Sequence, residues 1–280
     1  MLDAGIAATL TGMDTTAETF QISAEAAETY EAAFVPAFFD QWVPPLLDAA
    51  GVRPGRRVLD VACGTGVVAR GAADRVGEQA VTGLDVNEAM LAIARRVRPG
   101  ITWRRGDAAD LPFPDGTFDV VLCQMALMFF PDPARAVTEM ARVTAAGGTV
   151  AIDVPAALAD QEAFAAFVEM VAGHASAETA NLLTAYFACG DLDRLTGLLT
   201  AAGLVDVTAR TEPGRYRAPS IDIAVTTEVE STPLLERIDE PTYARIRADA
   251  HTVWRPWTTS GGALDAPFAT HVVTAHRPPQ

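Results

Sequence analysis

The segment Arg57–Arg70 combines a short apolar strand, a glycine turn and the start of a helix, and it constrains the fold more than any other part of the chain. Val58–Val61 is typical of a buried strand interrupted by Asp60, and Gly64 and Gly66 follow at the turn. Glycines let backbone N–H groups approach a ligand closely, and the helix N-terminus adds a partial positive charge. The carboxylate of Asp60 at the strand end suits a cationic group better than a phosphate. The segment therefore predicts a nucleotide-like ligand that carries a sulfonium or ammonium group.

The glycine spacing by itself leaves two ligands open. Gly64, Gly66 and Ala69 satisfy the dinucleotide pattern G-x-G-x-x-G/A, and Asp85 follows the loop by about 20 residues, as that pattern requires. Asp85 ends an expected strand over 80–85, where its carboxylate could accept hydrogen bonds from both hydroxyls of a ribose. These residues fit NAD and S-adenosylmethionine nearly equally, and a glycine turn with an unrelated surface aspartate is the remaining alternative.

Alternating strands and helices predict a parallel sheet. Expected strands lie at 57–61, 80–85, 101–105, 118–123 and 148–153, and expected helices lie at 66–76, 87–97 and 133–143. Helices of this length between strands imply right-handed crossovers and a doubly wound α/β fold, in which ligands bind outside the carboxyl ends of the strands. Asp60, Asp85, Asp107 and Gln124 all fall at or just beyond such ends. We therefore expect one site at that edge, with Asp107 placed to hold a donor such as an adenine amino group.

Five sequence blocks lie in register across residues 52–155. They are Val58–Gly66, Gly83–Asn87 with Met90 and Leu91, Gly106–Ala108 with Leu111–Phe113, Phe118–Leu122, and Glu139–Val143 with Gly147 and Gly148. Through these blocks the chain resembles the class I S-adenosylmethionine-dependent methyltransferases. It is most similar to the small-molecule branch that includes the ubiquinone/menaquinone-biosynthesis C-methyltransferases.

This resemblance implies a Rossmann-like, seven-stranded sheet that is mostly parallel with an antiparallel C-terminal edge. It also implies an N-terminal helix over the cofactor cleft and helical lid insertions. The implied cofactor is S-adenosyl-L-methionine, and the residues expected to bind it are Tyr30, Asp60, Ala62, Gly64, Gly66, Asp85, Val86, Met90, Asp107, Ala108 and Gln124. The loop after the fourth strand would then face both the methionine and the methyl acceptor.

Composition and the family topology divide the chain into four parts, of which the first is polar and the third is apolar and helical. We expect a flexible N-terminus over 1–23, the N-terminal helix and cofactor-binding core over 24–155, a helical lid insertion over 156–203, and the last strands over 204–280 with a helical insertion at 219–260. The last two strands are expected at 204–210 and 269–275. In the N-terminal helix, aromatic residues recur at helical spacing up to Pro44 and Pro45, where we expect the helix to break.

No decisive motif marks the acceptor pocket. Phe34 in the N-terminal helix and Trp254 in the second insertion are expected to contact the acceptor. Leu127 and Met128, in the loop after the fourth strand, are expected to do the same, although all four side chains could serve packing alone. His251 is the candidate general base, because it lies near Trp254 and histidine titrates near neutral pH. The alternative is a helix-end histidine packed near tryptophans.

Charge and cysteine content restrict the class of partner. The net charge is −15 and all 21 basic residues are arginines, so an acidic surface repels nucleic acids and anionic membranes. No apolar stretch reaches the roughly 18 residues of a membrane span, and the N-terminus lacks the basic region of a signal peptide. Cys63, Cys123 and Cys189 are few and scattered, which favours the reducing cytoplasm. No cluster of His, Cys and carboxylates has ligand spacing, so we expect no metal.

Together these features predict transfer of a methyl group, by in-line displacement, to a small and largely apolar organic acceptor. An NAD-dependent oxidoreductase is the first alternative, although its commonest type uses a Tyr/Lys pair and the chain contains no lysine. The second alternative is a protein that binds S-adenosylmethionine without transferring a methyl group. The sequence predicts neither the identity of the acceptor nor the oligomeric state.

Overall fold

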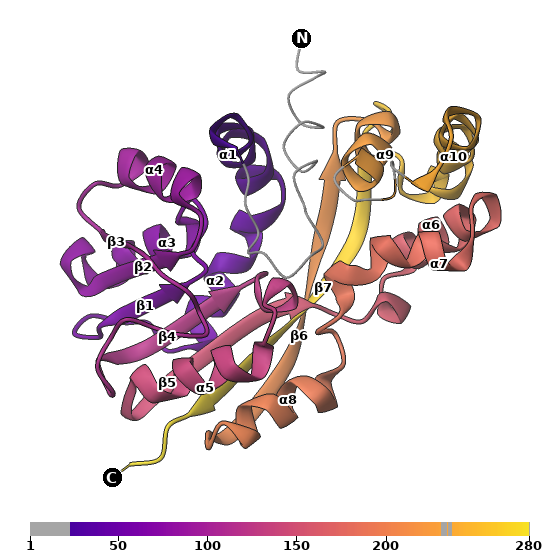
Figure 1. Cartoon of the computed structure of the whole chain (residues 1–280). Coiled ribbons are helices and arrows are strands. Elements are labelled where there is room, and N and C mark those ends of the chain that lie inside the picture. The colour runs from indigo at the N-terminus through magenta and orange to yellow at the C-terminus, as the bar shows by residue number, and fades with distance from the viewer. Residues whose placement is uncertain (1–22, 231–233, 235–236, 280) are drawn as a thin grey trace.

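Seven strands form one sheet in the computed structural model, which describes residues 23–230, 234 and 237–279 (Figure 1). In sheet order they are β3 (Thr102–Arg105), β2 (Val81–Asp85), β1 (Val58–Val61), β4 (Phe118–Gln124), β5 (Thr144–Pro155), β7 (Leu264–His276) and β6 (Val205–Ala218). The strands from β3 to β5 are parallel, and β7 lies antiparallel to both β5 and β6. The predicted doubly wound sheet with an antiparallel C-terminal edge is therefore confirmed.

Helices alternate with the strands of the core and gather again after β5. The N-terminal run comprises α1 (Ala24–Thr29), the π-helix η2 (Tyr30–Phe39), η3 (Asp40–Trp42) and α2 (Val43–Ala49). The core helices are α3 (Val67–Val76), η4 (Glu78–Ala80), α4 (Glu88–Val97), η5 (Leu127–Phe129) and α5 (Pro133–Val143). After β5 come η6 (Leu158–Asp160), α6 (Glu162–His174), α7 (Ala177–Ala180), η7 (Asn181–Phe187), α8 (Leu192–Ala201), α9 (Ile221–Glu230), α10 (Glu240–Val253) and η9 (Arg255–Trp257).

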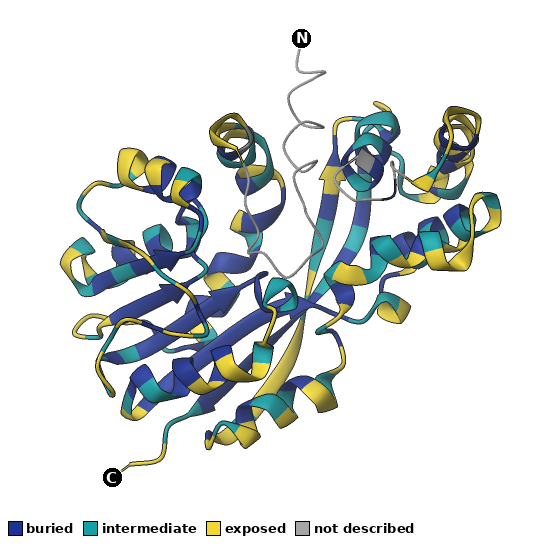
Figure 2. Cartoon of the chain, viewed as in Figure 1, coloured by how far each residue is buried: buried dark blue, intermediate teal, exposed yellow. Residues whose placement is uncertain are grey.

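Apolar side chains cover both faces of the central strands, which Figure 2 shows as the most buried part of the molecule. On one face, Leu46 of α2 and Ala72 of α3 pack over β1 and β4. On the other, Val137 and Met140 of α5 pack over β4 and β5. Because helices bury both faces, the strand ends are where ligands can reach the sheet.

A second layer of helices stands at the far end of β6 and β7, which run past the other strands (Figure 1). We call α6, α7, η7, α9 and α10 the lid. Within it, α10 packs against both α6 and α9. All five helices fall in the segments expected to form insertions, 156–203 and 219–260.

The strands β6 and β7 are longer than expected, because each continues through residues that disfavour strands. Pro213 and Gly214 lie inside β6, and Pro267 lies inside β7. β6 is an edge strand, where a missing N–H is tolerated. β5 ends opposite Thr270, so at Pro267 β7 pairs only with β6. The lid is therefore carried on a two-stranded extension of the sheet.

Two further expectations were wrong in detail. The insertion over 156–203 was expected to belong to the lid, but α8 covers the sheet, because Leu195 and Leu199 pack in the same apolar cluster as α5. Pro44 and Pro45 do not end the helical path; they lie in the first turn of α2, where proline is tolerated.

The flexible N-terminus expected over 1–23 lies almost entirely outside the described residues, which begin at residue 23. Among the described residues, the structure contains no helix that combines the length and apolar character needed to cross a membrane.

Candidate cofactor and acceptor site

A cavity of about 380 Å³ lies at the carboxyl ends of the parallel strands, bounded by η2 on one side and by the lid on another. The structure brings together every predicted cofactor residue except Gly66. The cavity is lined at this end by Tyr30, Asp60, Ala62, Gly64, Asp85, Val86, Met90, Asp107, Ala108 and Gln124. The convergence of the strand ends on one site, expected from the alternation of strands and helices, is thus seen in the structure.

Gly66 shapes the turn and does not line the cavity. It is the N-cap of α3 and has a φ of 91°, in the left-handed region that favours glycine. A Cβ atom at this position would lie 2.3 Å from the ring of Trp103 on β3. Gly66 is therefore required for close packing between the loop and the indole, and this accounts for its place in the glycine pattern.

Asp85, at the end of β2, is fixed by the backbone of two loops. Its Oδ2 accepts the N–H of Gly64 at 2.8 Å, and its Oδ1 accepts the N–H of Asn87 at 2.8 Å. Asn87 in turn caps α4 by accepting the N–H groups of Ala89 and Met90. Burial raises the pKa of the Asp85 carboxyl, and these backbone hydrogen bonds partly offset that rise. The carboxylate is held in one orientation at the cavity wall.

Asp60, at the end of β1, and Gln124, at the end of β4, both line the cavity with side-chain oxygens that can accept hydrogen bonds from a ligand. Asp60 Oδ2 accepts the N–H of Ala69 at 2.9 Å, and burial raises the pKa of the Asp60 carboxyl to about 8. The Gln124 amide donates to the carbonyl of Phe39 at 3.0 Å, which fixes its orientation. Its buried Oε1 has no hydrogen-bond partner among the described residues. A buried acceptor beside a buried carboxylate fits a cationic N–H donor.

The loop that carries Asp107 and Ala108 is anchored from α5. Glu139 is buried, and its Oε2 accepts the N–H of Leu111 at 3.0 Å. Arg142 donates to the same carboxylate and to the carbonyl of Leu111. The Arg142 guanidinium, through its hydrogen bond, lowers the pKa of Glu139, so the pair keeps its charges at neutral pH. This ion pair holds the loop after β3 against the cavity.

Aromatic side chains from η2 close the cavity over the glycine loop. Tyr30 and Phe34 line it, and their ring centroids lie 6.2 Å apart. Tyr30 also lies 5.1 Å from Phe39, between centroids. The expectation that Tyr30 and Phe34 contact a ligand remains a prediction, to which their place in the wall lends support.

The loop after β4 faces the cavity with other side chains than expected. Met125, Ala126, Phe129 and Phe130 line the cavity, whereas Leu127 and Met128 do not. Leu127 is fully buried and packs in the cluster beneath the sheet face covered by α5. The turn at η5 thus directs Leu127 into the core.

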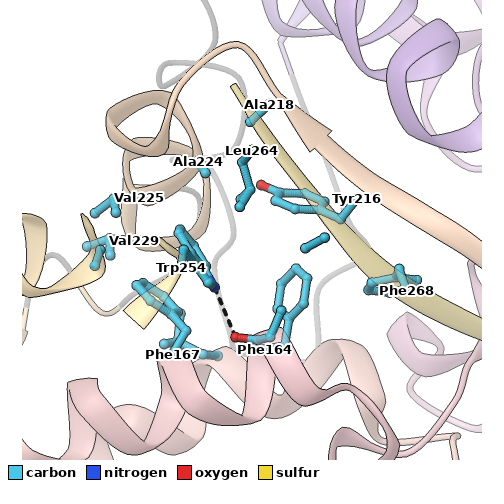
Figure 3. Close-up of a cluster of buried hydrophobic side chains, with 14 of the residues drawn as sticks. Phe164, Phe167, Tyr216, Ala218, Ala224, Val225, Val229, Trp254, Leu264 and Phe268 are labelled. Carbon is cyan, nitrogen blue, oxygen red and sulfur yellow. Dashed lines mark hydrogen bonds between the residues drawn. The ribbon is translucent and has the colours of Figure 1, made fainter. Parts of the chain in front are cut away.

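Trp254 and His251 also lie outside the cavity lining. Trp254 is fully buried, its indole N–H donates to the carbonyl of Ala163 at 2.9 Å, and its ring stacks on Phe167 at 4.3 Å (Figure 3). His251 lies on the outer side of α10 with half of its side chain exposed, and its Nε2 lies 3.5 Å from Asp222. We therefore assign neither residue to the site, and Trp254 belongs to the core of the lid.

The lid end of the cavity contains polar side chains that the sequence analysis missed. Asn181, Tyr186, Tyr216, Thr227 and Glu228 line it among aromatic residues. The Tyr216 hydroxyl hydrogen-bonds to Glu228, and burial raises the pKa of Glu228 to about 7. No spacing motif connects these residues, because they come from η7, β6 and α9. Only the fold brings them together.

Within the described ranges, no group of three or more His, Cys, Asp and Glu side chains could hold a metal ion. The expectation that no metal is needed remains a prediction.

Comparisons with known proteins bear on the identity of this site. A model described as a methyltransferase domain matches residues 59–152. Nocamycin O-methyltransferase from Saccharothrix syringae is 34% identical over 204 residues, which cover 67% of this chain and 73% of that protein. The chain belongs to the S-adenosylmethionine-dependent methyltransferase family. This agrees with the resemblance found in the five sequence blocks, and it disfavours the NAD-dependent alternative.

Other relatives match over a shorter region. The demethylmenaquinone methyltransferase of Renibacterium salmoninarum is 41% identical over 112 residues, which cover 40% of this chain and 46% of that protein. This chain therefore spans less than half the length of that relative. Phosphoethanolamine N-methyltransferase 2 of Haemonchus contortus, solved with S-adenosylhomocysteine, shares the fold with a TM-score of 0.57 and 19% identity, over 92% of this chain and 58% of that one.

Proposed function

We propose that the protein transfers the methyl group of S-adenosylmethionine to a small, largely apolar organic acceptor. One observation carries the proposal: a single cavity joins the carboxylates at the strand ends to an aromatic chamber under the lid. Its donor end offers carboxylates and a buried amide oxygen, and its other end offers Phe164, Phe187 and Phe268. A donor and an acceptor can therefore meet in one enclosed space.

The donor end fits the cofactor group by group. Asp60 and the unpaired Oε1 of Gln124 would meet the ammonium of the methionine part. Asp85, oriented by Gly64 and Asn87, would accept the ribose hydroxyls. Asp107 would hold the adenine amino group from the loop after β3. When bound, S-adenosylmethionine supplies an activated methyl group on a sulfonium.

The chain's contribution to the reaction is alignment and exclusion of water. In-line displacement requires the nucleophile to lie behind the methyl group, and positioning of this kind contributes much of the rate gain in such reactions. Aromatic walls from η2, η5 and the lid surround the chamber and favour an apolar acceptor. Exclusion of water also strengthens the interactions of the carboxylates with a cationic donor.

The names of two relatives support a small-molecule acceptor, since one acts on nocamycin and the other on demethylmenaquinone. A net charge of −15 disfavours a nucleic acid as the acceptor. The three cysteines are free, which supports the proposal that the protein works in the cytoplasm.

Calorimetry with S-adenosylmethionine and with NAD tests the cofactor. We expect binding of the first and none of the second, and the reverse would overturn the assignment. Incubation with a metabolite extract and methyl-labelled S-adenosylmethionine then tests transfer. Binding of the cofactor without label in any small molecule would favour the alternative of a non-methylating binding protein.

A further inference from the structure

We propose that Glu228 is the general base of the reaction and accepts the proton of a hydroxyl group, so that the acceptor is an apolar molecule bearing a phenol or enol hydroxyl. The inference rests on the proposed methyl-transfer function and names the acceptor class for the same cavity. It replaces His251 in the role of base, because His251 lies outside the cavity whereas Glu228 lines it.

The position of Glu228 carries the argument. It belongs to α9 and lines the same cavity as Asp60 and Asp85, which belong to the strand ends. A carboxylate in the lid therefore lies in the same cavity as the donor end. The polar side chains at this end are few and lie among aromatic ones, so we expect a bound acceptor to have an apolar body with a polar head near Glu228.

Tyr216 orients the carboxyl group. Its hydroxyl hydrogen-bonds to Glu228, and its ring lies 5.0 Å from Phe164 between centroids. Phe164 in turn packs at 5.4 Å from Phe268. Figure 3 shows these three side chains together between α6 and the strands β6 and β7. The aromatic packing fixes the side chain of Tyr216, and the Tyr216 hydroxyl in turn orients one side of the Glu228 carboxyl group.

The pKa of Glu228 suits the role of a general base near neutral pH. Burial raises its pKa to about 7, and the hydrogen bond from Tyr216 limits the rise. Two titratable side chains of the described elements, Tyr216 on β6 and Tyr186 on η7, interact with Glu228, and burial raises the pKa of both. On α9 itself, Asp222 points away and pairs with Arg247 at 3.0 Å. Glu228 is thus a group at the lid end that changes charge near neutral pH.

The proton and electron balance of the step is complete. The acceptor oxygen forms a bond to the methyl carbon, and the bond between that carbon and the sulfonium sulfur breaks. The electron pair of the broken bond goes to sulfur, which becomes a neutral thioether. The hydroxyl proton passes to the Glu228 carboxylate and leaves to solvent when the product is released. A base whose pKa lies near the working pH is the efficient choice for this transfer.

The competing role for Glu228 is that of a permanent negative charge that binds an acceptor with an ammonium group. A carboxyl group that is only half ionised near neutral pH and already accepts a phenol hydrogen bond is a poor fixed anion. It is well matched to gaining and losing a proton. The observations therefore favour the base, and the competing role becomes an outcome of the test.

Two naphthols with the same ring system test the role directly. Purified protein is assayed with S-adenosylmethionine and either 1-naphthol or the more acidic 4-nitro-1-naphthol, across the neutral pH range. 1-Naphthylmethylamine is the cationic counterpart. The variants are Glu228→Gln, Tyr216→Phe and the matched control Asp222→Asn, which changes a carboxylate to an amide on the outer face of α9.

We expect Glu228→Gln to lower methylation of 1-naphthol by about 10²-fold or more, with loss of the rise in rate near pH 7. The same variant should lower methylation of 4-nitro-1-naphthol by less than about threefold, because the ionised phenol needs no base. Tyr216→Phe removes a hydrogen bond to the charged form of Glu228 and should shift the pH profile upward. Asp222→Asn should behave as the wild type does.

Four results would overturn the proposal. The first three are equal losses with both naphthols in Glu228→Gln, an unchanged rate with 1-naphthol in that variant, and methylation by the wild type of the amine and of neither naphthol. Wild-type protein that binds S-adenosylmethionine but methylates none of the three probes also rejects the hydroxyl acceptor. Calorimetry and the labelled metabolite extract separate these results from failure of the proposed function. That failure would appear as absence of cofactor binding in the wild type, or as absence of label in every small molecule of the extract.

Discussion

At the scale of a single residue, we expect the buried carboxyl of Asp60 to couple cofactor binding to pH. It lies at the end of β1, and burial raises its pKa to about 8. In the free protein near pH 7 this carboxyl is therefore largely protonated. A cation beside it would favour the ionised form, so we expect binding of S-adenosylmethionine to release a proton.

We expect the affinity for S-adenosylmethionine to rise with pH, by at most about tenfold per pH unit, until the pH exceeds the pKa of free Asp60. Asp60→Asn should lower affinity and flatten this dependence. Ionisation of S-adenosylmethionine itself affects both proteins equally, so its effect cancels in the ratio of wild-type to variant affinity. Calorimetry from pH 6 to 9, in buffers of different ionisation enthalpy, measures both affinity and proton release. An equal pH slope in the two proteins would show that Asp60 does not face the cation.

Asp85 should be the most sensitive single position for cofactor affinity. Asp85→Ala removes the carboxylate that we propose accepts two ribose hydroxyls. It also frees the N–H of Gly64, which donates to Asp85 Oδ2 in the structure. Hydrogen bonds to a charged group predict a loss of roughly 1.5–3 kcal/mol in binding free energy. Asp107→Ala, in an exposed position, should cost less. Titration calorimetry on both variants compares them, and unchanged affinity in Asp85→Ala would contradict the assignment.

The sequence predicted the cavity lining at the strand ends better than the lining under the lid. Asp60, Asp85 and Gln124 follow apolar strands, and strand ends of a parallel sheet must meet at one edge. Glu228 follows no such rule, because it is a helical residue whose distance from β6 is set by the lid. Trp254 is the opposite case, because it was predicted to line the pocket and is buried in the lid. The sequence around an aromatic residue does not indicate whether its side chain packs in a core or lines a pocket.

Among the elements, β6 and β7 differ most from expectation. Local propensity ends each strand near its proline, at Pro213 and Pro267. Pairing between the two strands nevertheless continues to Ala218 and Leu264. Gly214 in this extension lies against the buried ring of Trp42, which comes from the N-terminal helical run. A non-local contact therefore maintains a strand that its own sequence disfavours.

Gly214→Ala tests that contact. The added Cβ would lie 1.9 Å from the ring of Trp42, so the strand or the indole must move. Overpacking of this kind predicts a loss of about 1–3 kcal/mol in the free energy of unfolding. Gly197→Ala in α8 is the matched control, because nothing lies within 4 Å of its Cβ position. It should gain roughly 0.5–1 kcal/mol, since alanine favours helices. Urea unfolding measures the free energy of unfolding of both variants. Equal stabilities of the two variants would show that the Trp42 ring can move aside at little cost.

At the scale of the whole molecule, the two ends of the cavity come from different parts of the chain. The donor end is built from η2 and the ends of β1 to β4, and the acceptor end from the lid and the extended strands. Sequence composition had indicated this division near Pro155, where the matching blocks stop. It could not show that α8 covers the sheet, because an apolar helical face looks the same whether it packs on a sheet or on a lid.

Exchange of the lid should therefore transfer acceptor preference and leave cofactor binding in place. In one chimera, 158–190 and 219–260 come from a related methyltransferase of different acceptor preference and α8 is retained. In a second chimera, α8 is exchanged as well. The first chimera should take on the acceptor preference of the methyltransferase that supplied the lid. Its affinity for S-adenosylmethionine should stay within about threefold of the wild-type value, since distant sites contribute independently. The second should unfold at lower urea concentration, because Leu195 and Leu199 no longer match the face of the sheet. Acceptor preference that stays with the recipient core in a folded first chimera would show that the lid does not select the acceptor.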